Sequence, residues 1–273
     1  MQLIGEFFSV MTVIKMGVVI VFTVSLSLVA EVVSPRFAGI LSGYPMGAAV
    51  ALFFMGVEAG PRFAAQSALH TSTGVVATLV FTYGYYQGSV LSRKLGGPPQ
   101  ILCASIVGVG GYLAASCLLC FAPGNITLGL VLPVIAILVF IQLFKGVENV
   151  NIDQRVSVRP KMLFLRSLFA ASTVWLVIFT AKMVGPTWAG LFSAFPHIIL
   201  PLVVIIHFTY DPEHAYVILK NAPKGIGAVV IFSLAVSLSY PVYGVYAGTV
   251  IAYAMATVYL VAAQFYDSLL KRS

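Results

Sequence analysis

The chain has 273 residues, of which 60% are hydrophobic and 8% charged, and its mean hydropathy is +1.02. Soluble domains average about 45–50% apolar and about 25% charged residues, so eight acidic and fifteen basic side chains are too few to coat a soluble protein of this size. The net charge of +7 comes from basic residues at the ends of apolar runs, not from the basic stripe of a nucleic-acid binder. The composition therefore predicts an integral membrane protein, with the lipid bilayer as its main partner and no nucleic acid.

Nine apolar segments are each long enough for a membrane-spanning helix, which needs about 20 residues. In chain order they cover 9–31, 37–57, 63–88, 100–122, 126–145, 161–183, 187–208, 215–240 and 243–265. The N-terminal run MQLIGEFFSV lacks the basic n-region of a signal peptide, so we expect the first segment to be retained. We predict an all-α polytopic membrane helix bundle with about nine transmembrane helices.

The basic residues in the loops sort to one side of such a bundle. One predicted side holds Arg36, Arg93, Lys94, Lys145, Arg155, Arg159, Lys161, Lys220, Lys224, Lys271 and Arg272. The other side holds only Arg62 and Lys182. Because cytoplasmic loops carry the excess of Lys and Arg, we predict a multi-pass protein of the plasma or bacterial inner membrane, with its N-terminus outside and its C-terminus in the cytoplasm.

Two segments align without gaps at an offset of 151 residues. Residues 33–45 read VSPRFAGILSGYP and residues 184–196 read VGPTWAGLFSAFP, with six identical positions. The same offset continues beyond this core, where it aligns Gly74 with Gly225 and pairs further Pro, Ala and Phe residues. A constant register across so many positions favours an internal duplication over a shared bias in helix packing.

The two copies lie in the second and seventh predicted spans, which cross the membrane in opposite directions because their span numbers differ by five. We therefore predict two inverted-topology repeats, 1–145 with five spans and 161–273 with four, joined by a cytoplasmic linker over 146–160. Inverted repeats are typical of secondary transporters, whose substrate site lies at the repeat interface near the midplane of the membrane.

The shared element, P-x-x-A-G-x-x-S-x-(aromatic)-P, interrupts a helix in each half. Pro45 and Pro196 each remove a helical hydrogen bond, so a carbonyl group one turn earlier needs another partner. With a rise of about 1.5 Å per residue, both interruptions lie about 9–13 Å from a membrane face, near the middle of the bilayer. We predict a substrate site formed by Ser42, Gly43, Tyr44, Pro45, Ser193, Phe195, Pro196 and His197. The alternative is a proline-kinked packing contact without a ligand.

Other ionisable residues within the spans are candidates for the solute pathway or for coupling, because such groups are costly in lipid. Lys15 and Arg166 form one pair of the repeat, and each lies a turn or two from a membrane face, where snorkelling is the alternative explanation. Glu31 or Glu58 would supply a partner for either cation.

The third span opens with more polarity than a lipid-facing helix tolerates, so we expect this stretch to face protein or water. Its polar residues are Gln66, His70, Thr71, Ser72 and Thr73. At the far end of the span, Tyr83, Tyr85 and Tyr86 are typical of an interfacial aromatic belt, and we expect His207, near another span end, to lie at an interface as well.

No arrangement of residues in the sequence indicates an enzyme, a metal site or a cofactor. There is no H-E-x-x-H, no Gly-rich phosphate loop and no pair of aspartates within the spans. A histidine-based hydrolase would also need an activated nucleophile and an orienting acid, and we cannot assemble these from the sequence.

The stretches RFAGILSGYPMGAAVALFFMGVEAGPRFAA and TWAGLFSAFPHIILPLVVIIHF resemble a group of small prokaryotic inner-membrane proteins of unknown function. Those proteins carry a short A/G-G-x-x-A/S-x-x-P element, in some cases twice. The resemblance implies a compact multi-pass bundle and no particular substrate. The predicted architecture is also similar to that of inverted-repeat carriers with five plus five spans, from which this chain departs by lacking a tenth span.

We therefore expect a secondary transporter or exporter of a small anionic or zwitterionic solute, working by alternating access around two Pro-broken helices. The alternative is a non-transporting integral membrane subunit or scaffold of a membrane complex; a channel or a lipid-handling protein ranks below both. The small-residue face of Gly108, Gly110 and Gly111 would suit a homodimer.

Overall fold

The computed structural model describes residues 17–18, 20–21, 43–147 and 160–269. Its helices are α4 (Met46–Ala59), α5 (Pro61–Leu91), α6 (Gly97–Leu119), α7 (Ile126–Leu143), α8 (Pro160–Ser193), α9 (Ile199–Thr209) and α10 (Pro212–Leu269). No β-strand occurs among these described residues, which confirms the all-α class there. Most of the first predicted span, 9–31, and most of the linker, 146–160, lie outside the described residues.

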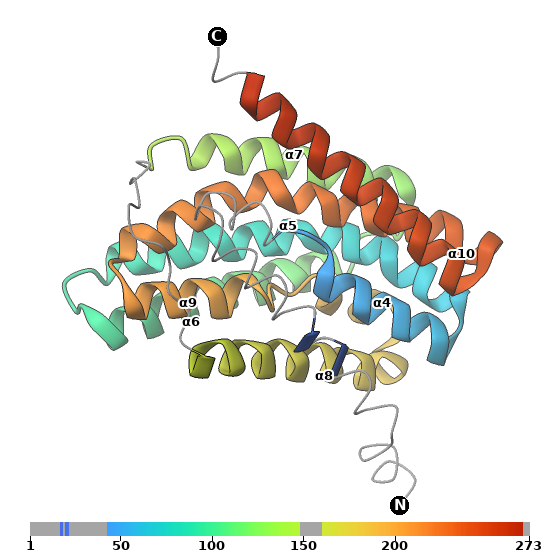
Figure 1. Cartoon of the computed structure of the whole chain (residues 1–273), viewed down its shortest axis with the longest axis horizontal. Helices are drawn as coiled ribbons and strands as arrows, with labels where there is room; N and C mark the ends of the chain where they lie inside the picture. Colours follow the sequence, from blue (N-terminus) through green and yellow to red (C-terminus); the bar gives the residue numbers. More distant parts are fainter. Residues whose placement is uncertain (1–16, 19, 22–42, 148–159, 270–273) are drawn as a thin grey trace, which may run out of the picture.

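Two of the helices are divided by a glycine in the left-handed region of backbone space. Gly185 has φ 77° within α8, and Gly244 has φ 76° within α10. Glycine adopts this conformation without the steric cost that a Cβ imposes, so the chain changes direction at both points. After Gly244 the chain folds back along the bundle towards the C-terminus (Figure 1), and the Tyr240 hydroxyl lies 2.7 Å from that of Thr249 across this hairpin.

In the described part of the chain, four helical segments are long and apolar enough to cross a membrane. They are Gly97–Leu119, Ile126–Leu143, Ala171–Ser193 and Pro212–Ala263. On α6 and α7, large apolar side chains such as Leu102, Ile106 and Leu138 are exposed, as lipid-facing residues would be. The apolar helices therefore indicate a membrane protein.

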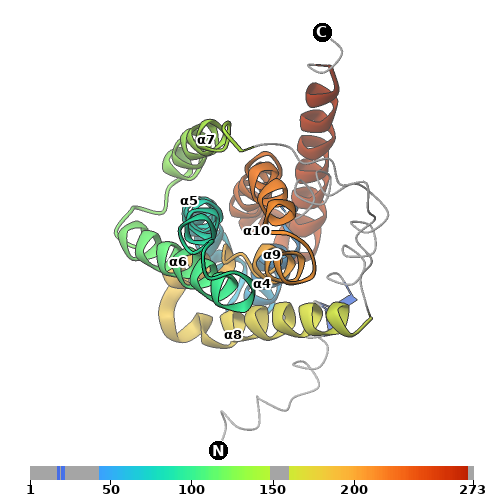
Figure 2. The same ribbon diagram turned by 90° about the vertical axis from the view of Figure 1, so that its left-hand side faces the viewer.

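Helix α5 lies at the centre of the bundle, in contact with α4, α6, α7, α8 and α10 (Figure 2). This position explains why α5 carries more hydroxyl groups than the outer helices. Thr71 donates to the carbonyl of Ser67, and Ser72 donates to the carbonyl of Gly129 on α7, so these two buried hydroxyls have protein partners, whereas the buried hydroxyl of Ser67 has none among the described residues.

Two helices, α4 and α9, are too short to cross a bilayer of about 30 Å by themselves, since each residue adds about 1.5 Å. Helix α9 follows the end of α8 after a break of five residues, 194–198, and α4 begins directly after Pro45. These two interruptions occur in the two copies of the repeated element, and they meet inside the bundle.

Candidate functional site

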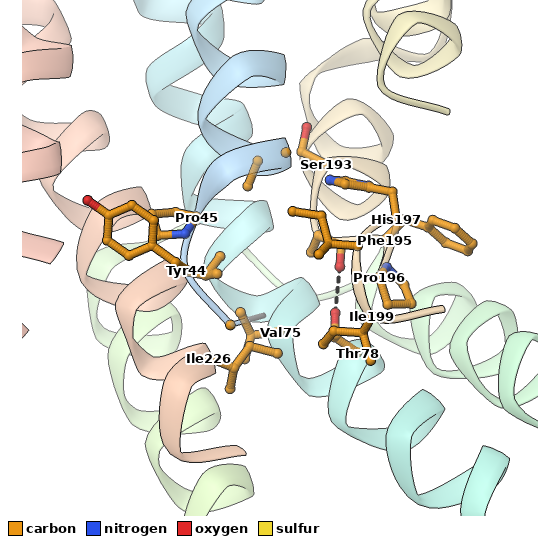
Figure 3. Close-up of a pocket in the computed structure, with 16 residues that line it drawn as sticks. Tyr44, Pro45, Val75, Thr78, Ser193, Phe195, Pro196, His197, Ile199 and Ile226 are labelled. Atoms are coloured by element: carbon orange, nitrogen blue, oxygen red, sulfur yellow. Dashed lines mark hydrogen bonds between the residues drawn. The ribbon is translucent and has the colours of Figure 1, made fainter. Parts of the chain in front are cut away.

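A cavity lies where the start of α4 meets the break between α8 and α9 (Figure 3). It is lined by Gly43, Tyr44, Pro45, Gly47, Ala48, Val75, Thr78, Ser193, Ala194, Phe195, Pro196, His197, Ile198, Ile199, Ile226 and Val229. Its volume is about 40 Å³, which is room for two or three waters when each needs about 10–15 Å³. Seven of the eight residues predicted to form the substrate site lie together here, and the eighth, Ser42, is outside the described residues.

At the second interruption the helix stops because Pro196 has no N–H to continue it. The N–H of Phe195 donates instead to the carbonyl of Phe192, at 3.0 Å, so the carbonyl predicted to be left free is satisfied by the turn itself. Ser193 donates to the carbonyl of Ala189, at 2.7 Å, and not to the carbonyl of Phe192. The element is therefore a complete break with its own hydrogen bonds rather than a kink.

At the first interruption Pro45 is the residue before α4, with φ −74° and ψ 40°. The two aromatic residues that precede the prolines point away from each other across the cavity (Figure 3). Tyr44 donates to or accepts from the hydroxyl of Thr257, at 2.7 Å, on the last part of α10. The ring of Phe195 packs edge-on against Tyr112 of α6, with 5.1 Å between the ring centres. Each aromatic side chain thus fixes its loop to an outer helix.

Small residues allow the two loops to approach the central helices closely. A Cβ on Gly43 would overlap the backbone of Gly225 in α10, and a Cβ on Gly74 in α5 would lie 2.9 Å from the Cβ of Ala194. Thr78 of α5 donates to the carbonyl of Ala194, at 2.5 Å. Backbone and small side chains therefore make the close contacts between these loops and α5 and α10.

His197 is the most unusual residue of the site. Its side chain is 4% exposed, and its Nδ1 has no hydrogen-bond partner in the described part of the chain. The imidazole lies flat against Gly47, where a Cβ would overlap its Nε2. Six other buried side-chain atoms among the described residues also lack a partner, including Nδ1 of His70 and Nε2 of His207, so what distinguishes His197 as a candidate ligand-binding group is its place in the cavity wall.

The polar residues predicted at the start of the third span do not reach the cavity. Thr71 and Thr73 bond to carbonyl groups of their own helix, and Gln66 is exposed. His70 is buried as expected, and its Nε2 lies 3.4 Å from the Thr187 hydroxyl, at the start of the segment of α8 after Gly185. His70 thus joins α5 to α8, and none of these residues lines the site.

Of the four charged residues predicted to act in the pathway, Arg166 and Glu58 lie in described helices. Lys15 and Glu31 lie outside the described residues, and Arg166 belongs to α8. Glu58 lies near the end of α4, about 15 Å along the helix from the cavity at its start. Their coupling role stays a prediction.

Tyr85 and His207, which we predicted to lie at a membrane interface, are buried inside the protein. Tyr85 is fully buried, His207 is 5% exposed, and the Tyr85 hydroxyl lies 3.2 Å from Nδ1 of His207. The two side chains therefore pack between α5 and the last turn of α9, and their depth in a membrane stays a prediction.

Sequence reasoning missed the cavity walls on α5 and α10. Val75 and Thr78 line the cavity from α5, and Ile226 and Val229 line it from α10. The sequence did contain a signal for these residues. At the offset of 151, Val75 pairs with Ile226 and Thr78 with Val229, one and four residues after the aligned glycines Gly74 and Gly225.

Comparison of the chain with protein-family models, with curated proteins and with solved structures finds no match. Among the described residues, no three His, Cys, Asp or Glu side chains are grouped so that they could hold a metal ion. The functional argument therefore depends on the geometry of the cavity.

Proposed function

We propose that the protein is a secondary transporter or exporter of a small solute, which works by alternating access to the cavity between its two interrupted helices. The observation that carries this proposal is the composition of the cavity wall, which both halves of the chain supply in matching positions. The geometry favours a site shared between two halves over a packing contact within one of them.

Most of the cavity wall consists of residue pairs separated by 151 positions. The pairs are Gly43 and Ala194, Tyr44 and Phe195, Pro45 and Pro196, Gly47 and Ile198, Ala48 and Ile199, Val75 and Ile226, and Thr78 and Val229. The offset was identified from sequence identity alone, and the cavity was located from shape alone, so their agreement supports two repeats that meet at the site. A substrate site at the interface of inverted repeats is the arrangement found in many secondary transporters.

The close contacts around the cavity follow the same register. Gly43 of the first half packs on Gly225 of the second, while Ala194 of the second half packs on Gly74 of the first. Adding 151 to the numbers of Gly43 and Gly74 gives Ala194 and Gly225, so each loop packs against the long helix of the other half. This exchange supports a two-fold relation between the repeats.

The helices also support the nine-span topology with five and four spans. Division at Gly185 and Gly244 separates α8 and α10 into segments that match the predicted spans 161–183, 215–240 and 243–265. The part of α8 after Gly185, together with α9, then makes one interrupted crossing. We propose that the first copy of the element forms the equivalent crossing with α4.

Contacts at the ends of the helices support the proposed orientation, with the N-terminus outside and the C-terminus in the cytoplasm. Arg93 forms an ion pair with Glu213, at 2.8 Å, and Lys220 donates to the carbonyl of Val147. All four residues belong to the side that the Lys and Arg bias assigns to the cytoplasm of a plasma or inner membrane.

Alternating access would depend on the contacts that hold the two loops. Each loop is held through its aromatic side chain to a helix of the other half, Tyr44 to Thr257 on α10 and Phe195 to Tyr112 on α6. Gly43 packs on α10 through small residues, whereas the carbonyl of Ala194 also accepts a hydrogen bond from Thr78 of α5. A rocking motion of one half against the other would exchange these few contacts, the Thr78 hydrogen bond among them, and would open the cavity to either side.

Cysteine labelling from each side of the membrane tests this proposal. In a background without Cys103, Cys117 and Cys120, Ser193→Cys places a thiol in the cavity with little change of volume. We expect a membrane-impermeant maleimide to label Ser193→Cys from outside in right-side-out vesicles and from the cytoplasmic side in inverted vesicles.

A matched control is Leu138→Cys, which lies on α7 with 60% of its side chain exposed where lipid would cover it. We expect the control to react from neither side. Reaction of Ser193→Cys from one side only, under all solutes tested, would contradict alternating access, and no reaction from either side would mean that the two interruptions are packing devices.

A further inference from the structure

The first turn of α4 has two backbone donors without acceptors. Met46 donates its N–H to the carbonyl of Tyr44, at 2.7 Å, and Ala49 donates to the carbonyl of Pro45, at 2.8 Å. Between them, the N–H groups of Gly47 and Ala48 have no acceptor among the described residues. The N-terminal N–H groups of a helix point outward from its end, and both of these residues line the cavity.

The start of α9 repeats this arrangement. Leu200 donates to the carbonyl of Pro196, at 2.8 Å, whereas the N–H groups of Ile198 and Ile199 have no acceptor in the described parts of the chain. Ile198 and Ile199 line the cavity too, at 151 positions from Gly47 and Ala48. Neither helix has a side-chain cap or an acidic residue in its first turn. Two uncapped helix N-termini therefore border one cavity.

Two carbonyl groups at the end of α8 are, by contrast, already occupied. The carbonyl of Leu191 accepts from the Tyr112 hydroxyl at 2.6 Å, and that of Ala194 accepts from the Thr78 hydroxyl at 2.5 Å. A cation would need such oxygens as ligands. At the cavity, four backbone N–H groups lack acceptors, and lining carbonyls including those of Gly43 and Ser193 lack donors, among the described residues.

His197 adds an independent observation that points to a ligand. Its ring is directed between the end of α8 and the start of α4 (Figure 3), and its Nδ1 is buried without a partner among the residues described. Either ring nitrogen of a histidine is a donor when it carries the proton. His197 lines the cavity with its Nε2 beside Gly47, so an acceptor ligand there would lie near the imidazole and the backbone donors together.

We infer that the cavity binds a small anion through the N-termini of α4 and α9 and the imidazole of His197. Each helix N-terminus carries a partial positive charge of about half an elementary charge, so two of them at one water-poor site favour a negative ligand. The present volume admits an anion of about one to four non-hydrogen atoms, the size of a halide, nitrate or formate. This inference depends on the proposed function, since it names the substrate class of the same site.

Thermal unfolding of the purified full-length protein tests the inference, with sodium nitrate and sodium formate as probes and sodium gluconate, which is too large for the cavity, balancing the ionic strength. We expect a saturable rise in Tm of about 2–8 °C with nitrate or formate at millimolar concentration. A non-specific salt effect would run the other way, because weakly hydrated anions destabilise folded proteins relative to strongly excluded ones.

Two variants identify the donors. Ile199→Pro removes one N–H at the first position of α9, and some loss of stability is expected because Ile198 before it lies in the α region that a following proline disfavours; Ile199→Val keeps the N–H as its matched control. We expect Ile199→Pro and His197→Ala to lose at least half of the nitrate-dependent shift, and Ile199→Val to keep it. Because each shift is measured within one variant, a general loss of stability does not imitate the result.

The outcomes separate this inference from the proposed function. Equal Tm values in nitrate, formate and gluconate would overturn the anion site, as would a shift that survives in both Ile199→Pro and His197→Ala. Side-dependent labelling of Ser193→Cys would then still support a transporter of a neutral or zwitterionic solute. A nitrate shift that the variants abolish, together with labelling from one side only, would support the anion site and overturn alternating access.

Discussion

Replacing Gly47 with alanine tests how closely α4 approaches the imidazole of His197. A Cβ at this position would overlap Nε2 of His197, and the ring must move by about 2 Å to reach an ordinary contact distance of about 3.5 Å. The ring is buried against packed helices, and its open direction is the cavity. We expect Gly47→Ala to destabilise the protein by about 1–3 kcal/mol, as overpacked core sites do, and to reduce the volume of the cavity.

Gly110→Ala is the matched control, because a Cβ on Gly110 in α6 meets nothing within 4 Å. Alanine in place of an exposed helical glycine gains up to about 1 kcal/mol, so the two variants are expected to differ by about 2–4 kcal/mol, or at least about 4 °C in Tm. The double variant Gly47→Ala with His197→Ala removes the overlap, and we expect a coupling energy of at least about 1 kcal/mol.

The assay is thermal unfolding of the purified chain in detergent, with labelling of Ser193→Cys as a second readout of the cavity. The reasoning would be refuted if Gly47→Ala were as stable as Gly110→Ala. It would also be refuted if the effects of Gly47→Ala and His197→Ala were additive, since that would mean that the ring does not occupy the space beside Gly47.

Three further predictions concern the contacts that hold the site. Tyr112→Phe keeps the ring beside Phe195 but removes the donor to the carbonyl of Leu191, so we expect a loss of about 1 kcal/mol in unfolding free energy; no loss would mean that this hydrogen bond does not fix the break. Gly190→Ala places a Cβ on the carbonyl of Ser67 and forces α8 away from α5. We therefore expect a larger drop in Tm than for alanine at a glycine with no neighbour within 4 Å, such as Gly110, and an unchanged Tm would contradict the close packing of the two helices. Arg93→Gln removes an ion pair whose arginine is 70% exposed, so we expect a change in unfolding free energy below about 1 kcal/mol, and a larger change would mean that the pair is better shielded from solvent than its exposure indicates.

Periodicity and composition were sufficient to predict the helices, because a membrane protein has few alternatives for a long apolar segment. The segments 100–122 and 126–145 correspond closely to α6, Gly97–Leu119, and α7, Ile126–Leu143. The repeated element located the candidate site for a related reason. A proline inside an apolar run either ends the helix or leaves a carbonyl group that needs another hydrogen-bond partner. Because Pro45 and Pro196 occupy the same place in the two copies of the element, they indicated where the two copies meet.

The cavity walls on α5 and α10 could not be predicted in the same way. Thr78 has the sequence properties of any hydroxyl on a polar helix, and only the packing of the 194–198 break against α5 gives it the carbonyl of Ala194 as a partner. The burial of His207 depends on how the last turn of α9 packs against Tyr85 of α5, which the sequence around His207 does not show. Whether such a residue is buried depends on how the helices pack against one another, and the sequence of one span does not determine that packing.

The central claim, that the two ends of the bundle open in turn, is tested most directly by distances between spin labels placed across the two halves. Arg62 with Lys182 marks the predicted outer end, and Lys94 with Asp211 marks the cytoplasmic end; all four side chains are exposed. We expect two distance populations for each pair in lipid nanodiscs, and addition of nitrate to shift the two pairs in opposite directions. A single, unchanging distance at both ends would contradict alternating access and would leave a static membrane bundle.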